Sequence, residues 1–173
     1  MLKTEDLEIL NESTKDCWSI YIIDQRPIGA FKGYIDESEK LQRYLSRLRK
    51  DLELAQLSIG NRWSRTNFIT ASEIVKSIAM VSIAYDEVLL SENDCNSIAK
   101  KFLSDFEEDA IFLTTGMFNT SHPLNEGLDF NINGISDSDV VAEETSGKGY
   151  LFASAVVVYD RDNIGVFCKC ESD

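Results

Sequence analysis

The longest apolar stretch of the chain runs from Ser72 to Leu90. Its apolar residues are Ile74, Val75, Ile78, Ala79, Met80, Val81, Ile83, Ala84, Tyr85, Val88, Leu89 and Leu90. Because these residues cover most of a helical circumference rather than one stripe, the pattern predicts a helix that is buried on most sides. Lys76, Asp86 and Glu87 interrupt the stretch before it reaches the roughly 18 to 20 apolar residues of a membrane span. We therefore expect the central helix of a globular core, capped by Thr70 and Glu73.

Three further helices are indicated. Asp36 and Glu39 have the spacing of a capping box and predict a long helix to about Ser58. Its apolar positions repeat every three or four residues: Leu41, Tyr44, Leu45, Leu48, Leu52 and Ala55. Another helix is expected after Ser91, with Ile98, Phe102, Leu103 and Phe106 on its apolar side. Residues 4–15 are typical of a short helix with Thr4 as its cap.

The remaining segments have the short β-branched runs and period-two alternation of strands. Residues 18–23 and 28–35 are expected to pair as a first hairpin. Further strands are predicted at residues 111–115, 130–135, 140–144, 150–159 and 163–170, with the polar turn 160–162 joining the last two. This order of elements predicts an α+β fold, in which a mainly antiparallel sheet packs against about three helices in a single layer on one side.

Composition limits the class of protein. The 173 residues are 43% hydrophobic and contain no Pro-rich or Gly/Ser-rich linker, so we expect a single globular domain, 1–173, that is a monomer or a weak homodimer. The first ten residues are acidic where a secretory signal would be basic and then apolar, which favours a cytoplasmic location. The four cysteines, at positions 17, 95, 168 and 170, are accordingly expected to be reduced thiols.

The net charge of −13 is unevenly distributed. Residues 1–69 hold 11 acidic and 11 basic residues, so residues 70–173 carry the whole net charge. Within them, residues 102–162 contain 12 acidic residues against Lys148 and Arg161. Such a field repels nucleic acid and anionic membranes and favours a basic protein partner. The basic residues at positions 40–50 are expected to pair with carboxylates of their own helix.

No residue pattern indicates catalysis, a metal or a cofactor. Cys168 and Cys170 share one face of a predicted strand, but a zinc site requires two more ligands, so we expect both thiols in the core beside Ile164 and Val166. His122 is the single histidine, and neither a nucleophile elbow nor a zinc-protease motif accompanies it. We therefore assign no catalytic residue and no metal ligand.

The acidic loops 119–129 and 136–149 are the expected partner-binding region. The candidate binding residues are Glu126, Asp129, Asp137, Asp139, Glu143 and Glu144. In general character the chain resembles bacterial immunity proteins and antitoxins, small acidic α+β proteins that cover basic nuclease toxins; this likeness of class assigns a role to no residue. It implies a non-enzymatic inhibitor of a basic toxin domain. The alternatives are a small cytoplasmic enzyme, a hydrolase or transferase, and a structural or assembly component.

Overall fold

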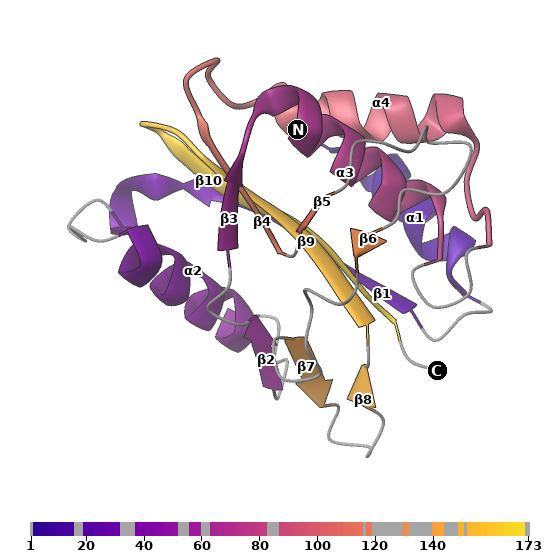
Figure 1. Ribbon diagram of the computed structural model, residues 1–173, viewed down its shortest axis with the longest axis horizontal. Coiled ribbons are helices and arrows are strands. Elements are labelled where there is room, and N and C mark those ends of the chain that lie inside the picture. Colours follow the sequence, from indigo (N-terminus) through magenta and orange to yellow (C-terminus); the bar gives the residue numbers. More distant parts are fainter. Residues whose placement is uncertain are drawn as a thin grey trace.

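A five-stranded antiparallel sheet forms the centre of the protein (Figure 1). The computed structural model describes residues 2–15, 19–31, 37–51, 56–59, 63–82, 87–115, 117–118, 130–131, 140–143, 149–150 and 152–171. The strand order is β1-β10-β9-β4-β3. These strands are β1 (Ser19–Pro27), β3 (Trp63–Thr66), β4 (Ile111–Thr115), β9 (Phe152–Tyr159) and β10 (Asn163–Glu171). All neighbouring strands of this sheet are antiparallel, which confirms the predicted α+β class.

Helices cover both faces of this sheet. Helix α2 (Glu37–Asp51) packs on one face, whereas α1 (Thr4–Ser13), α3 (Phe68–Met80) and α4 (Glu92–Leu103) pack on the other (Figure 1). We expected the helices on one side only, and this expectation was wrong. The reason lies in the central strands, which are apolar on both faces, since Ala155 and Val157 face one core and Val156 and Val158 face the other.

The core beneath α2 follows the sequence pattern closely. The described apolar stripe of this helix is buried against the sheet: Leu41, Tyr44, Leu45 and Leu48. Cys168 and Cys170 lie in the same core beside Ile164 and Val166, as predicted from their shared strand face. Both thiols are unbridged, and so is Cys95.

The core on the other face is built from α3, α4 and aromatic residues of the sheet. Ile74, Val75 and Ile78 of α3 are completely buried. Phe102 of α4 meets Phe167 of β10 edge to face, with ring centroids 5.4 Å apart. The hydroxyl oxygen of Ser91 accepts a hydrogen bond from the amide of Asp94 at 3.2 Å, so Ser91 caps α4 as predicted.

Helix α3 is shorter than the apolar stretch that predicts it. Its N-cap is Asn67, whose side chain accepts a hydrogen bond from the Thr70 amide at 2.9 Å, rather than Thr70 itself. The helix ends at Met80 because Val81 is extended, with φ −124° and ψ 141°, and forms a β-bridge with Val88. The amide of Leu89 then donates to the Met80 carbonyl at 2.7 Å. The chain therefore reverses where we expected the helix to continue to Leu90.

Two other boundaries differ from the prediction. Helix α2 ends at Asp51, although we expected it to continue to about Ser58, and Gln56–Ile59 forms strand β2 paired with β7 (Val140–Glu143). The expected hairpin of residues 18–23 and 28–35 is also wrong, because β1 continues to Pro27 and pairs over its whole length with β10. Ile28–Phe31 then forms a 3-10 helix, η1. Both errors arise because strands distant in sequence supply the backbone hydrogen bonds: β10 pairs with β1, and β7 pairs with β2.

Short strands complete the described structure. Strand β7 also pairs with β8 (Gly149–Tyr150), and β5 (Met117–Phe118) pairs with β6 (Phe130–Asn131). The predicted hairpin around the turn 160–162 is confirmed, with Ile164 opposite Tyr159. None of the helices in the described segments combines the length and the apolar character that a membrane span requires.

Candidate functional site

The predicted partner-binding residues fall in the part of the chain that the structure does not describe. Glu126, Asp129, Asp137, Asp139 and Glu144 lie outside the described residues, as does His122. Glu143 ends β7, where its backbone lies opposite Gln56, but its side chain is also outside the description. The six-residue site therefore stays a prediction.

The described remainder of the acidic stretch gathers at one corner of the molecule. In Figure 1 the connection from α4 to β4 lies beside the turn between β9 and β10. The two segments, 105–109 and 160–162, form what we call the acidic corner. Its carboxylates are Asp105, Glu107, Glu108, Asp109, Asp160 and Asp162. The single cation of these segments, Arg161, pairs with Glu107 at 3.2 Å and with Asp162 at 3.3 Å.

Asp160 organises the acidic corner. One carboxylate oxygen accepts hydrogen bonds from the amides of Asp162 and Asn163, both at 2.7 Å, and the other accepts from the amide of Glu107 at 3.0 Å. Partial burial raises the pKa of this carboxyl, but the three amide bonds outweigh it and hold the pKa below its usual 3.8. Asp160 thus has a structural role, whereas Glu108 and Asp109 are exposed to solvent.

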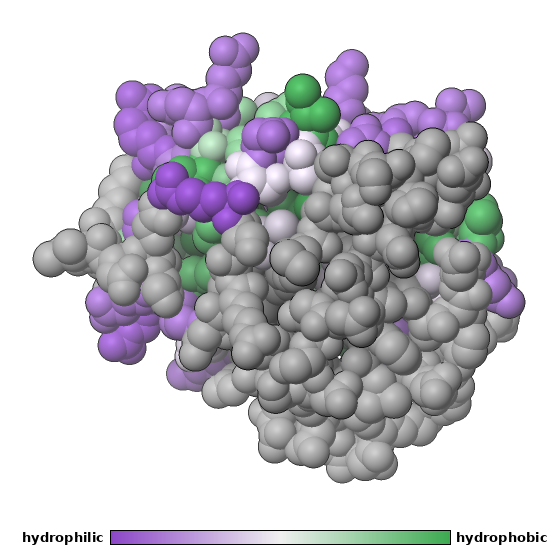
Figure 2. All heavy atoms as spheres, viewed as in Figure 1, coloured by the Kyte–Doolittle hydropathy of each residue, from purple (hydrophilic) through white to green (hydrophobic). Residues whose placement is uncertain are grey.

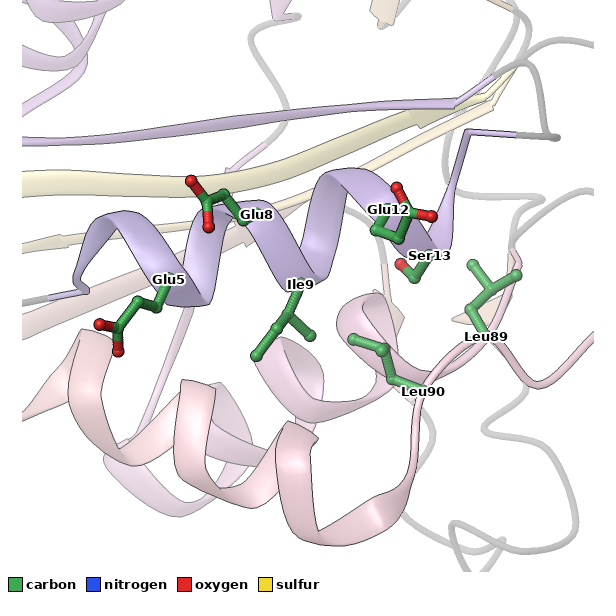
Figure 3. A pocket seen from close by; sticks show the side chains of 7 residues that line it. All are labelled: Glu5, Glu8, Ile9, Glu12, Ser13, Leu89 and Leu90. Carbon is green, nitrogen blue, oxygen red and sulfur yellow. The ribbon is translucent and has the colours of Figure 1, made fainter.

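A second acidic surface lies along α1. An open groove of about 590 Å³ separates this helix from the residues that precede α4, and Figure 3 shows Ile9 extending from α1 towards Leu90. We call it the α1 groove. Its lining residues are Glu5, Glu8, Ile9, Glu12, Ser13, Leu89 and Leu90. The groove thus combines apolar side chains with three carboxylates.

Two inward residues fix the position of α1. Leu10 is completely buried in the core with α3 and α4, and Asp6 is 5% exposed. The Asp6 carboxylate binds Lys101 of α4 at 2.5 Å and the Lys3 amide at 2.8 Å. Burial raises the Asp6 pKa, but these contacts outweigh it and lower the pKa below 3.8. The outward side of α1 is left to line the groove.

The carboxylates of the α1 groove are only partly neutralised. Glu12 pairs with Lys15, whereas Glu5 and Glu8 have no ion-pair partner within the described residues. Like charges three or four residues apart destabilise a helix by about 0.2–0.5 kcal/mol per pair. Repulsion between the exposed carboxylates therefore destabilises α1 slightly.

Our sequence reasoning missed this surface. We treated residues 1–69 as electrically neutral, and their sum is indeed zero. The signal was local, since Glu5, Glu8 and Glu12 recur at helical spacing on one short helix. Summing charge over a long segment concealed it.

A buried charged cluster lies where α3 ends. The Lys169 ammonium group contacts the Glu171 carboxylate at 2.6 Å and donates to the Val81 carbonyl at 2.9 Å. Ser82 donates to the same carboxylate at 2.9 Å. Lys169 and Glu171 are 0% and 1% exposed, so no ligand reaches them from solvent. The cluster stabilises the chain directly after α3. The positive charge of Lys169 also interacts favourably with the negative, C-terminal end of the α3 helix dipole.

The α2 side chains of Lys40, Tyr44 and Asp51 contact residues of the sheet. Arg26 of β1 binds Asp51 at 2.7 Å, and Arg26 also pairs with Asp24, which accepts a hydrogen bond from Tyr44 at 2.8 Å. Burial, followed by the negative charge of Asp24, raises the pKa of Tyr44. Lys40 lies over the Tyr159 ring, 5.0 Å from its centroid. These contacts attach α2 to the sheet.

Neither a search for metal ligands in the described residues nor comparison with known proteins assigns a further site. Among the side chains described here, no group of three or more His, Cys, Asp or Glu residues could hold a metal ion. Comparison with protein-family models, with curated proteins and with solved structures finds no match to this chain. We take the acidic corner and the α1 groove as candidate functional surfaces, each built from the contacts described above.

Proposed function

We propose that this chain is a non-enzymatic cytoplasmic inhibitor of the bacterial immunity or antitoxin type, which binds a basic, nuclease-like protein. The partner's cationic surface, used by such a protein to hold nucleic acid, would be covered by the acidic corner and by the acidic loops 119–129 and 136–149. Glu126, Asp129, Asp137, Asp139, Glu143 and Glu144 are the proposed contacts in the loops.

One observation carries the proposal: segments distant in sequence assemble the acidic corner. Glu107 and Asp160 are 53 residues apart but share a hydrogen bond, and the two segments that contain them hold six carboxylates and one arginine. A negatively charged surface of this kind raises the association rate with a positively charged partner about 10- to 1000-fold at low salt.

The proposal is tested by capture and inhibition. The tagged protein is used to capture partners from its source cells, and each captured protein is then purified and recombined with it. We expect a partner of basic isoelectric point in a one-to-one complex, with its nuclease activity suppressed by an equimolar amount of this chain. A partner that is acidic, or that stays fully active in the complex, would contradict the proposal.

A further inference from the structure

We infer that the α1 groove is the docking site for an amphipathic, cationic helix of the basic partner. This inference rests on the proposed function for the identity of the partner, but its geometric argument is independent of the acidic corner. Three features of the groove carry it: exposed apolar side chains, carboxylates at helical spacing, and an open shape.

Among the apolar side chains of the groove, Ile9 is exposed, whereas Leu89 and Leu90 are half-buried. Ile9 is 42% exposed on α1, and Val88, which directly precedes the groove residue Leu89, is 74% exposed. Figure 2 shows that hydrophobic side chains reach the surface among hydrophilic ones in the described part of the face in view. Ile9 and Leu90 point into a common hollow (Figure 3). Docking of an apolar helix face would remove them from water.

The carboxylates define the charge of the occupant. Glu5, Glu8 and Glu12 follow one another at intervals of three and four residues, so Glu5 and Glu12 are about 10 Å apart along the helix axis. A partner helix that lies along α1 would meet them with Lys or Arg at positions i, i+3 or i+4, and i+7. Leu, Ile or Met residues between these cations would fill the space beside Ile9. This is the recognition mode of a helix in a groove.

Other occupants fit less well. A second copy of this chain that docked through the same surface would bring its own α1 carboxylates against Glu5 and Glu8, and an anionic lipid surface would be repelled by the same groups. The groove is also open rather than enclosed, which suits an extended protein segment more than a small molecule.

A designed peptide tests the inference. The probe is a synthetic 18-residue helix with Lys and Leu at amphipathic spacing, and its control has the same composition in a scrambled, non-amphipathic order. Binding to the full chain is followed by amide NMR shifts. We expect the amphipathic peptide to bind at least tenfold more tightly than the control and to shift the amides of α1 and of residues 87–90.

Matched variants locate the binding surface. Ile9→Asp, and the triple change of Glu5, Glu8 and Glu12 to Gln, should each weaken peptide binding at least tenfold. Glu108→Gln, an exposed carboxylate of the acidic corner, should leave it within twofold. All five positions are exposed, so the variants should keep the fold, which circular dichroism checks.

Several outcomes would overturn the inference. These are equal binding of the scrambled peptide, shifts confined to the acidic corner, and self-association of the free protein that Ile9→Asp abolishes. Partner binding that survives Ile9→Asp but is lost on charge reversal of the acidic corner would also overturn it, while leaving the proposed function intact. If no basic partner exists, the proposed function fails, yet the peptide should still select the groove.

Discussion

Lys101 of α4 and Asp6 of α1 form an ion pair of 2.5 Å that attaches the N-terminal helix to the rest of the protein. One turn further along α1, the buried side chain of Leu10 provides the second attachment. An isolated helix of ten residues is marginal in water. The α1 groove therefore exists because these two residues hold the helix in place.

Replacing Asp6 with Ala should loosen α1. The change removes a charged acceptor that binds both Lys101 and the Lys3 amide, so we expect a loss of about 1.5–3 kcal/mol in the free energy of unfolding at pH 7. Urea denaturation measures this loss. The control is Glu12→Ala, which removes the exposed pair with Lys15 and should cost no more than about 1 kcal/mol.

The same variant should reveal the pH dependence of the ion pair. Because the folded-state pKa of Asp6 is below 3.8, its contribution is fully present above that value and is lost as the pH falls through the folded-state pKa. The stabilities of the parent and of Asp6→Ala should therefore converge below about pH 3.8. A difference that stays constant down to pH 2 would show that the ion pair is not its cause.

Lys169→Met should be strongly destabilising. It leaves the carboxylate of Glu171 buried without its countercharge, for which the usual cost is about 3–5 kcal/mol. In the double variant Lys169→Met, Glu171→Leu, neither charge of this pair is left buried, and most of the loss should be recovered. A double-mutant cycle by urea denaturation measures the coupling. Equal and additive losses would contradict the role assigned to the pair.

Ser154→Ala should stabilise the protein. The hydroxyl group of Ser154 is buried and has no hydrogen-bond partner among the described residues, and Ser154 lies on β9 opposite Lys169. A buried unsatisfied polar group costs about 1–3 kcal/mol, so its removal should raise the free energy of unfolding by about 1 kcal/mol. A decrease in stability would mean that this hydroxyl takes part in the charged cluster.

The buried thiols should be unreactive in the folded protein. The hydrogen bond with Cys170, followed by burial, raises the pKa of Cys168 well above 9.0, and burial raises that of Cys95 to about 11. In a Cys17→Ser background, a thiol reagent should therefore label Cys95, Cys168 and Cys170 only as the chain unfolds. Rapid labelling of native protein would contradict this packing.

The elements that the sequence predicted well are those with local signals. Ser91 and Asp94 mark the start of α4 by a side-chain cap, and the polar turn at 160–162 lies between two strands of clear alternation. Cys168 and Cys170 were placed in the core by the period of their strand and by the usual burial of free cysteines.

Non-local contacts account for what the sequence did not predict. Val81 continues an apolar run in sequence but leaves the helix because it bridges to Val88. Residues 19–27 pair with a strand more than 130 residues away, which no local pattern indicates. To predict the α1 groove, one would need both the local spacing of the glutamates on α1 and the chain reversal that brings Leu89 and Leu90 beside this helix.

The rate of association with the captured partner tests the central claim most directly. Asp137, Asp139, Glu143 and Glu144 are replaced by Lys in one variant, and Glu107, Glu108 and Asp109 in a second. The control variant reverses Arg43, Arg47 and Lys50 on α2. We predict that each acidic variant associates at least tenfold more slowly at low salt, that added salt removes the difference, and that the control associates like the parent. Acidic variants that bind like the parent, together with loss of binding in the control, would contradict the account.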